Sequence, residues 1–250
     1  MRSDGRNHGA MRKVRIDFDY TKHAAGSVHI TVGDTRVLCT CSVEDRVPSF
    51  LNHMNQGWIT AEYGMLPGST TTRSAREAAR GKQSGRTIEI QRLIGRSLRS
   101  VVNLSLLGTR TLLIDCDVIQ ADGGTRTASI TGGFLALAAA VVKLLDKKLI
   151  PFSPLQDYVA AISVGIIDGI ACLDLDYGED SRAEVDMNLV MTGRGQYVEI
   201  QGTAEKTPFA QEQLHQLQSL GAQGIRQLIE LQRTLLETRT DLERLFPLPK

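Results

Sequence analysis

Two stretches, one in each half of the chain, alternate apolar and polar residues on both sides of a turn signal. The first spans residues 27–43 and turns at Gly33-Asp34, and the second spans residues 158–175 and turns at Asp168-Gly169. A period of two on both sides of a turn predicts a β-hairpin, and Asp-Gly favours the type I′ turn that such hairpins use. Both halves are therefore expected to contain β-sheet, which excludes an all-helical fold.

Each predicted hairpin is followed by further strand and then by a strand, a loop and a long helix. In the first half these are a strand over 112–120 and a helix from about 131 to 147. In the second half they are a strand over 196–201 and helical spacing over about 208–245. A further helix, with apolar residues at the 3.6-residue period, is predicted over 88–102.

The repeated order of elements indicates an α+β fold built from a pseudo-duplicated, β-rich unit with flanking helices. We expect one domain over residues 1–250, made of two pseudo-symmetric halves, about 1–150 and 151–250, that pack on one another. The alternative is that two ordinary hairpins resemble each other by chance.

Composition indicates a soluble globular protein, since 42% of the 250 residues are apolar and 23% are charged. The longest apolar run, 134–142, is shorter than the ~18 residues that span a bilayer, and no apolar stretch follows the first residues. The cysteines lack the C-x-x-C spacing of zinc and redox sites. A cytoplasmic protein with reduced thiols and no membrane contact is the expectation.

Positive charge is concentrated in one segment, although the chain as a whole carries a formal charge of only +1. Between residues 73 and 99 two acidic residues stand against eight basic ones, which are Arg73, Arg76, Arg80, Lys82, Arg86, Arg92, Arg96 and Arg99. Arginine suits bidentate recognition of phosphate. The segment is either a phosphate-binding surface or a solvated charged face, and its charge alone does not decide between them.

Negative charge is concentrated between residues 174 and 186, where six acidic residues stand against Arg182. Leu173 and Leu175 alternate with acidic residues, and the same alternation resumes after residues 178–181. This pattern predicts a hairpin whose carboxylates lie on one face. Such carboxylates repel one another, and a bound Mg²⁺ or Mn²⁺ would remove that cost. A solvated acidic hairpin, or pairing with the basic segment, remains the alternative.

A glycine-rich stretch, 120–133, lies between a predicted strand and a predicted helix. Gly123-Gly124 lets backbone N–H groups converge on an anion, while Thr125 adds a hydroxyl and Arg126 a guanidinium. The helix that follows offers its positive N-terminus. These features predict a phosphate site that is neither a P-loop nor a dinucleotide-binding motif, although a plain turn with Ser129 or Thr131 as helix cap fits the loop equally well.

A phosphate loop, an arginine-rich segment and an acidic segment in this order resemble the ribonuclease PH family of phosphorolytic exoribonucleases. The resemblance covers essentially the whole chain. The stretches that carry it are Asp4-Gly5-Arg6, GSVHITVGDTRVLCTCSVE (26–44), GWITAEYGMLPGST (57–70), SGRTIEIQRLIGRSLRSVV (84–102), DCDVIQADGGTRTASITGG (115–133), LDLDYGEDSRAEVDMN (173–188) and VEIQGTAE (198–205).

The resemblance implies a ribonuclease PH-like fold, related to domain 2 of ribosomal protein S5, and a set of site residues. Inorganic phosphate would be held by Arg86, Gly124, Thr125 and Arg126. Asp180 and Asp186 would hold Mg²⁺ or Mn²⁺. The catalytic set implied in this way is Arg86, Thr125, Arg126, Asp180 and Asp186.

The resemblance also implies an assembly and an RNA surface. Family members form rings of six as trimers of dimers, with the arginine-rich loop near subunit contacts and the RNA entrance. The residues implied to bind RNA are Arg73, Arg76 and Arg80, to which the basic helix stripe adds Arg92 and Arg96.

The implied activity is reversible phosphorolysis of RNA from its 3′ end. Phosphate attacks the last internucleotide linkage and releases a nucleoside diphosphate, chiefly from precursor tRNA, with ribosomal RNA processing as a related expectation and no activity expected on DNA. Two other readings remain open, namely a catalytically inactive ring subunit of an RNA-degrading complex and an RNA-binding module without chemistry.

Overall fold

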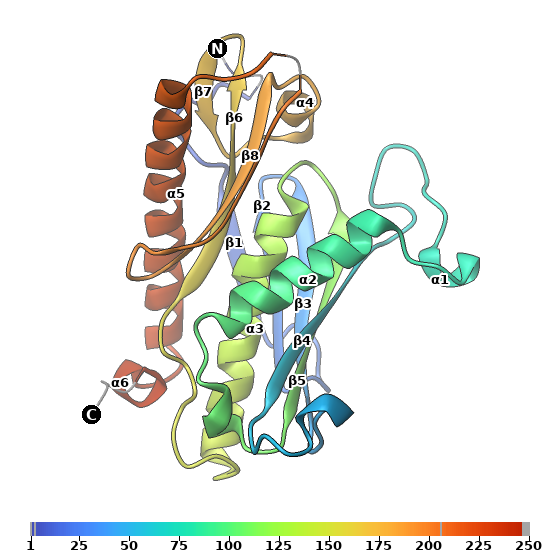
Figure 1. The fold of residues 1–250 in the computed structure, drawn as a ribbon, viewed down its shortest axis with the longest axis vertical. Coiled ribbons are helices and arrows are strands. Elements are labelled where there is room, and N and C mark those ends of the chain that lie inside the picture. Colours follow the sequence, from blue (N-terminus) through green and yellow to red (C-terminus); the bar gives the residue numbers. More distant parts are fainter. Residues whose placement is uncertain (1, 3, 206, 247–250) are drawn as a thin grey trace.

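Helix α3 (Thr125–Asp146) packs against β-sheets on two sides and occupies the centre of the fold (Figure 1). The computed structural model describes residues 2, 4–205 and 207–246. Within that part of the chain, α3 is the one helix that is long and apolar enough to cross a membrane, and 89% of its apolar window is buried inside the protein. Burial on this scale is what the central helix of a globular core requires.

The first half of the chain forms a five-stranded sheet in the order β1-β2-β3-β5-β4. Its strands are β1 (Val14–Phe18), β2 (Gly26–Val32), β3 (Thr35–Glu44), β4 (Trp58–Met65) and β5 (Thr111–Gln120). The predicted hairpin is confirmed as the antiparallel pair β2–β3. Strands β4 and β5 are parallel, and the chain between them contains α1 (Glu77–Arg80), α2 (Gly85–Arg99) and the short 3₁₀ helix Leu104–Leu107. A second 3₁₀ helix, Ser49–Leu51, precedes β4.

The second half forms a four-stranded antiparallel sheet in the order β7-β6-β8-β9. Its strands are β6 (Val159–Ile167), β7 (Ile170–Leu173), β8 (Val185–Thr192) and β9 (Tyr197–Ala204). The predicted hairpin is confirmed as β6–β7, and its turn residues Asp168 and Gly169 both have the positive φ of a type I′ turn, 50° and 75°.

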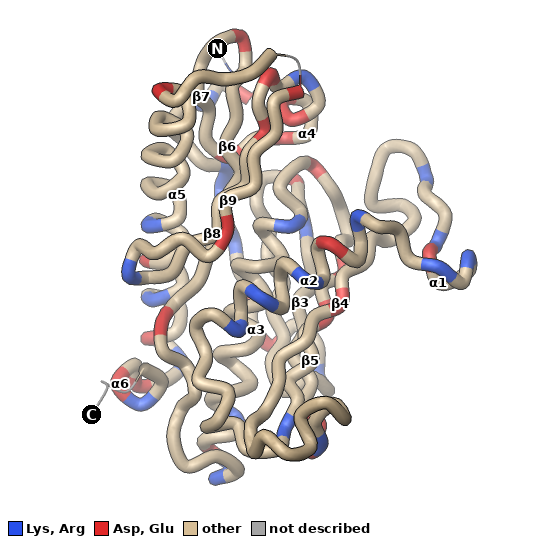
Figure 2. The backbone as a smooth tube through the Cα atoms, viewed as in Figure 1, with Lys and Arg blue, Asp and Glu red and all other residues tan. Residues whose placement is uncertain are grey.

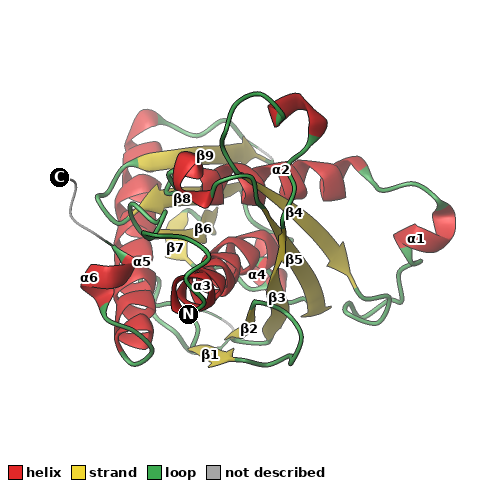
Figure 3. Cartoon of the chain, turned by 90° about the horizontal axis from the view of Figure 1, so that it is seen from below, coloured by secondary structure: helices red, strands yellow, loops and turns green. Residues whose placement is uncertain are grey.

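Helix α5 (Gln211–Glu237) covers one face of the second sheet (Figures 1 and 3). Helix α6 (Leu242–Leu245) follows it and contacts α3. The mixed α+β class is therefore confirmed. The four cysteines, Cys39, Cys41, Cys116 and Cys172, are buried free thiols.

The two sheets do not share one strand order. The first contains the parallel pair β4–β5, connected through α2, whereas the second is antiparallel throughout. The division of the chain into two related halves near residue 150 stays a prediction.

Two helices begin earlier than the sequence pattern predicted. Helix α3 begins at Thr125, because Gly124 adopts the left-handed conformation (φ 66°) that ends the loop before it. Ser129 and Thr131 therefore lie inside the helix and do not cap it, and the Ser129 hydroxyl donates to the carbonyl oxygen of Thr125 at 2.8 Å. Helix α2 begins after Ser84, whose hydroxyl accepts from the N–H of Thr87 at 3.1 Å.

The acidic hairpin predicted around residues 173–189 does not form. Strands β7 and β8 pair with opposite edges of β6 and not with each other. Asp174 takes a φ of 55°, which turns the chain out of the strand, and the short helix α4 (Tyr177–Asp180) follows. The residues Asp176 and Glu179 form a reciprocal capping box at its start. Asp-x-x-Glu is the spacing of such a box, which the period-two interpretation overlooked.

The contact between β2 and α3 generates a stability prediction. A side-chain Cβ at Gly26 would overlap the backbone carbonyl of Ala136, and backbone cannot move aside as a side chain can. We expect Gly26→Ala to lower the free energy of unfolding by about 3 kcal/mol in urea denaturation. Gly85→Ala is the matched control, since nothing lies within 4 Å of that position. Equal stability of the two variants would contradict the close packing of α3 on β2.

Candidate active site at the junction of the two sheets

A cleft of about 490 Å³ lies where the first sheet meets the second, and it brings together the residues predicted for phosphate and metal. Its walls include Arg86, Gly124, Thr125, Arg126, Asp180 and Asp186. They come from the start of α2, the start of α3, the end of α4 and β8. Residues that the sequence separates by up to 100 positions therefore share one site, although the cleft does not by itself assign their roles.

The loop of Asp122, Gly123 and Gly124, called the glycine loop below, forms the wall at the start of α3. Gly123 and Gly124 have φ values of 74° and 66°, which side-chain-bearing residues rarely adopt. A Cβ at Gly123 would come within 2.5 Å of the carbonyl oxygen of Leu175, so the loop also packs directly on the chain that leads into α4. No side chain caps the N-terminus of α3, which leaves its first N–H groups and its positive dipole end suited to an anion.

Two side chains of the first turn of α3 are held by residues that sequence reasoning missed. The guanidinium of Arg126 donates to the side-chain oxygen of Gln201 at 2.5 Å and to Glu89 at 3.3 Å. The hydroxyl of Thr125 lies 2.9 Å from that of Tyr63, whose pKa is raised by burial. Glu89, Tyr63 and Gln201 all stand in the stretches that carry the family resemblance, but nothing in their local pattern marks them as partners of α3.

The negative charges of Asp180 and Asp186 interact in a part of the cleft that is partly shielded from water. Burial raises the pKa of both carboxyl groups, and for Asp186 the negative charge of Asp180 adds to the effect and brings the pKa to about 6. The positive charges of Arg86 and Arg126 act in the opposite direction. One oxygen of Asp186, Oδ1, is buried and has no hydrogen-bond partner within the described chain.

An unpartnered buried carboxylate oxygen beside a second carboxylate suits a hard cation. No cluster of three or more acidic, histidine or cysteine side chains with metal-binding geometry exists among the described residues. Asp180 and Asp186 are the two residues that would supply the protein ligands of such a cation. Such a donor set fits Mg²⁺, which is commonly bound through one or two carboxylates and keeps its other positions for water and substrate phosphates.

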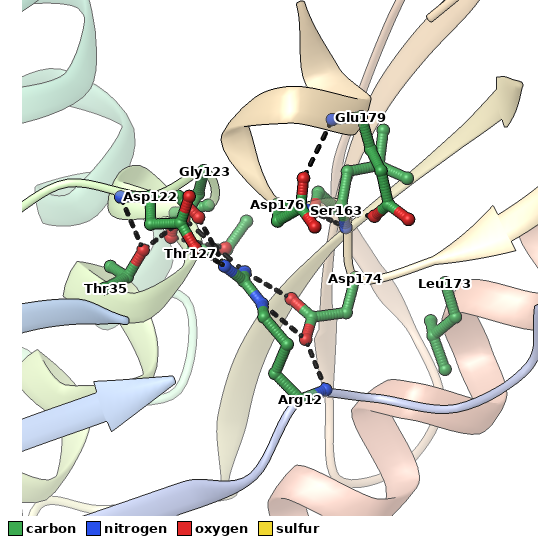
Figure 4. Close-up of polar contacts among 12 residues, drawn as sticks. Arg12, Thr35, Asp122, Gly123, Thr127, Ser163, Leu173, Asp174, Asp176 and Glu179 are labelled. Atoms are coloured by element: carbon green, nitrogen blue, oxygen red, sulfur yellow. Dashed lines mark hydrogen bonds and ion pairs between the residues drawn. The ribbon is translucent and has the colours of Figure 1, made fainter. Parts of the chain in front are cut away.

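Two other acids of the segment, Asp174 and Glu179, serve the fold and not the cleft, which corrects the expectation of one carboxylate-lined face. Asp174 accepts two bonds from the Arg12 guanidinium, at 2.7 and 3.0 Å, and Glu179 accepts two from Arg2, at 2.5 and 2.7 Å. All four side chains are buried. The partners of Asp174 and Glu179 are thus arginines of the N-terminal segment and not those of residues 73–99. Figure 4 shows Arg12 between Asp174 and the glycine loop.

The basic segment is divided among different places. Arg86, one of its eight basic residues, lines the cleft. Residues 70–84, with Arg73, Arg76 and Arg80 exposed, project from the body beside the start of α2 (Figures 1 and 2).

The arginines along α2 have individual surroundings. Arg92 is exposed, while Arg96 pairs with Glu199 at 3.1 Å and Arg99 lies over the ring of Trp58 at 4.5 Å. The helix stripe is therefore partly engaged within the protein.

Comparison with known proteins identifies the fold and the family. The profile of the 3′ exoribonuclease family matches residues 10–143 as its domain 1 and residues 157–224 as its domain 2. Rice (Oryza sativa) Rrp46 is similar in structure, with a TM-score of 0.76 and 20% identity over 94% of this chain and 100% of that one.

Two archaeal structures are similar to the same degree. A chain of the Archaeoglobus fulgidus exosome with RNA bound to the active site has a TM-score of 0.79 and 21% identity over 92% of each chain. A chain of an archaeal exosome core has a TM-score of 0.75 and 20% identity over 92% of this chain and 90% of that one. At these identities the likeness establishes the shared fold.

The pair of aspartates generates a prediction about stability and pH. Because the folded state raises the pKa of Asp186 to about 6, above its unfolded value of about 4, the ionised group destabilises the fold at neutral pH. We expect Asp186→Asn to raise Tm at pH 7.5 in the absence of divalent cations. The rise should be about 2–4 °C for each kcal/mol that the substitution adds to the free energy of unfolding. The difference from wild type should shrink as the pH falls from about 6 towards 4, because wild type then gains the same relief by protonation.

Thermal unfolding from pH 4.5 to 8 measures this dependence. Asp168→Asn, at an exposed turn position that tolerates asparagine, is the matched control and should show no such trend. A Tm for Asp186→Asn below that of wild type at pH 7.5 would contradict the conclusion that the ionised Asp186 carboxylate destabilises the fold.

Proposed function

We propose that this chain, which belongs to the 3′ exoribonuclease family, shortens RNA by phosphorolysis. The observation that carries the proposal is the cleft itself. An uncapped helix N-terminus with a glycine loop faces two partly desolvated aspartates, and two arginines line the same space. One wall therefore suits a free phosphate and the other suits a cation that would neutralise a reacting phosphodiester.

Positioning and charge account for the chemistry without a protein nucleophile. Inorganic phosphate, bound by the N–H groups at the start of α3 with Thr125, Arg126 and Arg86, is the attacking group. One of its oxygens forms a bond to the phosphorus of the last internucleotide linkage, and the bond from that phosphorus to the preceding 3′ oxygen breaks. The terminal nucleotide leaves as a nucleoside diphosphate, and the shortened RNA keeps a 3′ hydroxyl. Fixing the two reactants in line is the main contribution that such a site makes.

Asp180 and Asp186 would hold Mg²⁺ or Mn²⁺, which supplies positive charge for the reacting phosphoryl group and the leaving oxygen. The unpartnered Oδ1 atom of Asp186 supports this part of the proposal. Glu89 and Gln201 would keep the Arg126 guanidinium oriented when phosphate is absent.

The substrate is proposed to be RNA, chiefly the 3′ ends of precursor tRNA, in the cytoplasm. The resemblance in sequence motifs supports tRNA, and the similar fold of an archaeal exosome chain described with RNA at its active site supports RNA as the polymer. The buried free thiols agree with a reducing compartment.

Phosphate dependence tests the function directly. A precursor tRNA is incubated with the protein and Mg²⁺, with and without inorganic phosphate, and the released nucleotides are separated. We expect nucleoside diphosphates only when phosphate is present. Monophosphates would indicate hydrolysis, and no release under either condition would favour a ring subunit without chemistry. Either result contradicts the proposal.

Arg126→Ala and Arg86→Ala locate the phosphate site within that assay. Each loses a charge-assisted contact worth about 1.5–3 kcal/mol, so the phosphate concentration for half-maximal rate should rise about 10- to 150-fold while RNA binding is retained. Arg15→Ala removes an exposed arginine paired only at the surface with Asp17 and should leave the phosphate requirement unchanged. Wild-type phosphate kinetics in both cleft variants would overturn the phosphate assignment.

Assembly into a ring of six, as a trimer of dimers, is a further part of the proposal. The segment 70–84, which projects from the body (Figure 2), carries Arg73, Arg76 and Arg80 exposed to solvent. On a ring, neighbouring basic segments would add phosphate contacts along one RNA at high effective concentration.

We expect light scattering to show a hexamer for wild type and dimers for the double variant Arg73→Ala, Arg76→Ala, with weaker tRNA binding. Arg226→Ala with Arg233→Ala, two exposed arginines of α5, is the charge-matched control. A wild-type monomer, or an undisturbed hexamer in the Arg73 and Arg76 variant, would contradict the proposed role of the segment.

A further inference from the structure

All three carbonyl groups of the glycine loop accept hydrogen bonds from the protein. The carbonyl of Asp122 accepts from Nη1 of Arg12. That of Gly123 accepts from the hydroxyl of Thr35 at 2.6 Å and, over a longer distance of 3.5 Å, from Nη2 of Arg12. The carbonyl of Gly124 accepts from the N–H of Ala128 at 3.0 Å and from the Thr127 hydroxyl at 2.9 Å. The two bonds to Gly124 come from the first turn of α3 itself, whereas the others come from distant parts of the chain.

The direction of these carbonyls decides whether the loop attracts or repels an anion. A trans peptide is planar, so the N–H of one residue points opposite to the carbonyl of the residue before it, and the described chain contains no cis peptide. Arg12 therefore fixes the direction of the Gly123 N–H, and Thr35 fixes that of the Gly124 N–H. Without these two donors the loop could rotate its carbonyl oxygens towards the cleft, where their negative ends would oppose a phosphate.

Arg12 and Thr35 are themselves firmly held. The side chain of Arg12 is 5% exposed and is clamped by Asp174 through both carboxylate oxygens, at 2.7 and 3.0 Å (Figure 4). Thr35, the first residue of β3, is fully buried, and its hydroxyl also accepts from the N–H of Asp122 at 3.0 Å. Each side chain therefore has one orientation available, as a group that orients another must have.

We propose that Arg12 and Thr35 are positioning residues for phosphate, which act by holding the glycine loop with its carbonyls away from the cleft. Neither side chain lines the cleft around the predicted phosphate contacts, and both donate to carbonyls of the loop, to which we assign their effect on phosphate. The inference rests on the proposed function only in taking phosphate as the ligand of the loop.

Thr35→Val and Thr35→Ser form a matched pair that isolates the hydroxyl. Valine keeps the shape and the β-branched strand preference but can neither donate to Gly123 nor accept from Asp122, while serine keeps both contacts. Arg12→Lys retains a charge beside Asp174, but one ammonium cannot replace the planar fork that spans Asp174 and the loop. Arg15→Lys, at an exposed arginine of the neighbouring strand, is the control for that change.

Calorimetric titration with inorganic phosphate, without RNA or metal, measures binding independently of turnover. We expect Thr35→Val and Arg12→Lys to weaken phosphate binding about 10-fold, and Thr35→Ser and Arg15→Lys to bind within twofold of wild type. In the RNA assay, Thr35→Val should raise KM for phosphate and leave KM for RNA unchanged. A merely structural role would lower the active fraction, and hence kcat, without moving either KM.

The failure of this inference can be told apart from the failure of the proposed function. If wild type binds phosphate but releases no nucleoside diphosphate, the proposed function is wrong. The phosphate affinities of Thr35→Val and Thr35→Ser then still decide the inference. Phosphate binding by Thr35→Val as tight as that of wild type, or no binding by wild type, overturns it. Thr35→Val keeps the test decisive if Arg12→Lys fails to fold.

Discussion

The buried ion pair between Arg12 and Asp174 is the contact on which the rest of the site depends. Asp174 belongs to the second half of the chain, and the remaining donors of the same guanidinium reach the glycine loop of the first half. One side chain thus fixes the glycine-loop wall of the cleft relative to the segment that leads to Asp180. Removing one partner of such a pair leaves an uncompensated buried charge, which typically costs about 3–5 kcal/mol.

A site divided between two sheets follows from this arrangement. The first half contributes a backbone that suits an anion, and the second contributes carboxylates that suit a cation. In the proposed reaction, a phosphodiester and a free phosphate would both occupy this cleft. Under the proposed function, this opposition across one cleft would let like-charged reactants approach, because each would meet opposite charge from the protein or a bound cation.

Local patterns predicted the parts of the structure that local interactions decide. Both hairpins follow from alternation around turns, and the glycine loop at the start of α3 follows from Gly123-Gly124. The acidic hairpin failed because the partner of Asp174 is Arg12, 162 positions away, and this pairing overrides the period-two pattern. Tyr63, Glu89 and Gln201 were missed for the same reason, since their contacts with α3 are tertiary and leave no periodic signal.

The central claim is that phosphate held at the start of α3 is the group that attacks the RNA. Incubation of RNA with ³²P-labelled inorganic phosphate, followed by analysis of the released nucleotides, tests this claim most directly. The account predicts that the label appears in the terminal phosphate of the nucleoside diphosphates and is absent from the remaining RNA. Release of unlabelled nucleotides would mean that water, and not bound phosphate, is the attacking group, and would contradict the account.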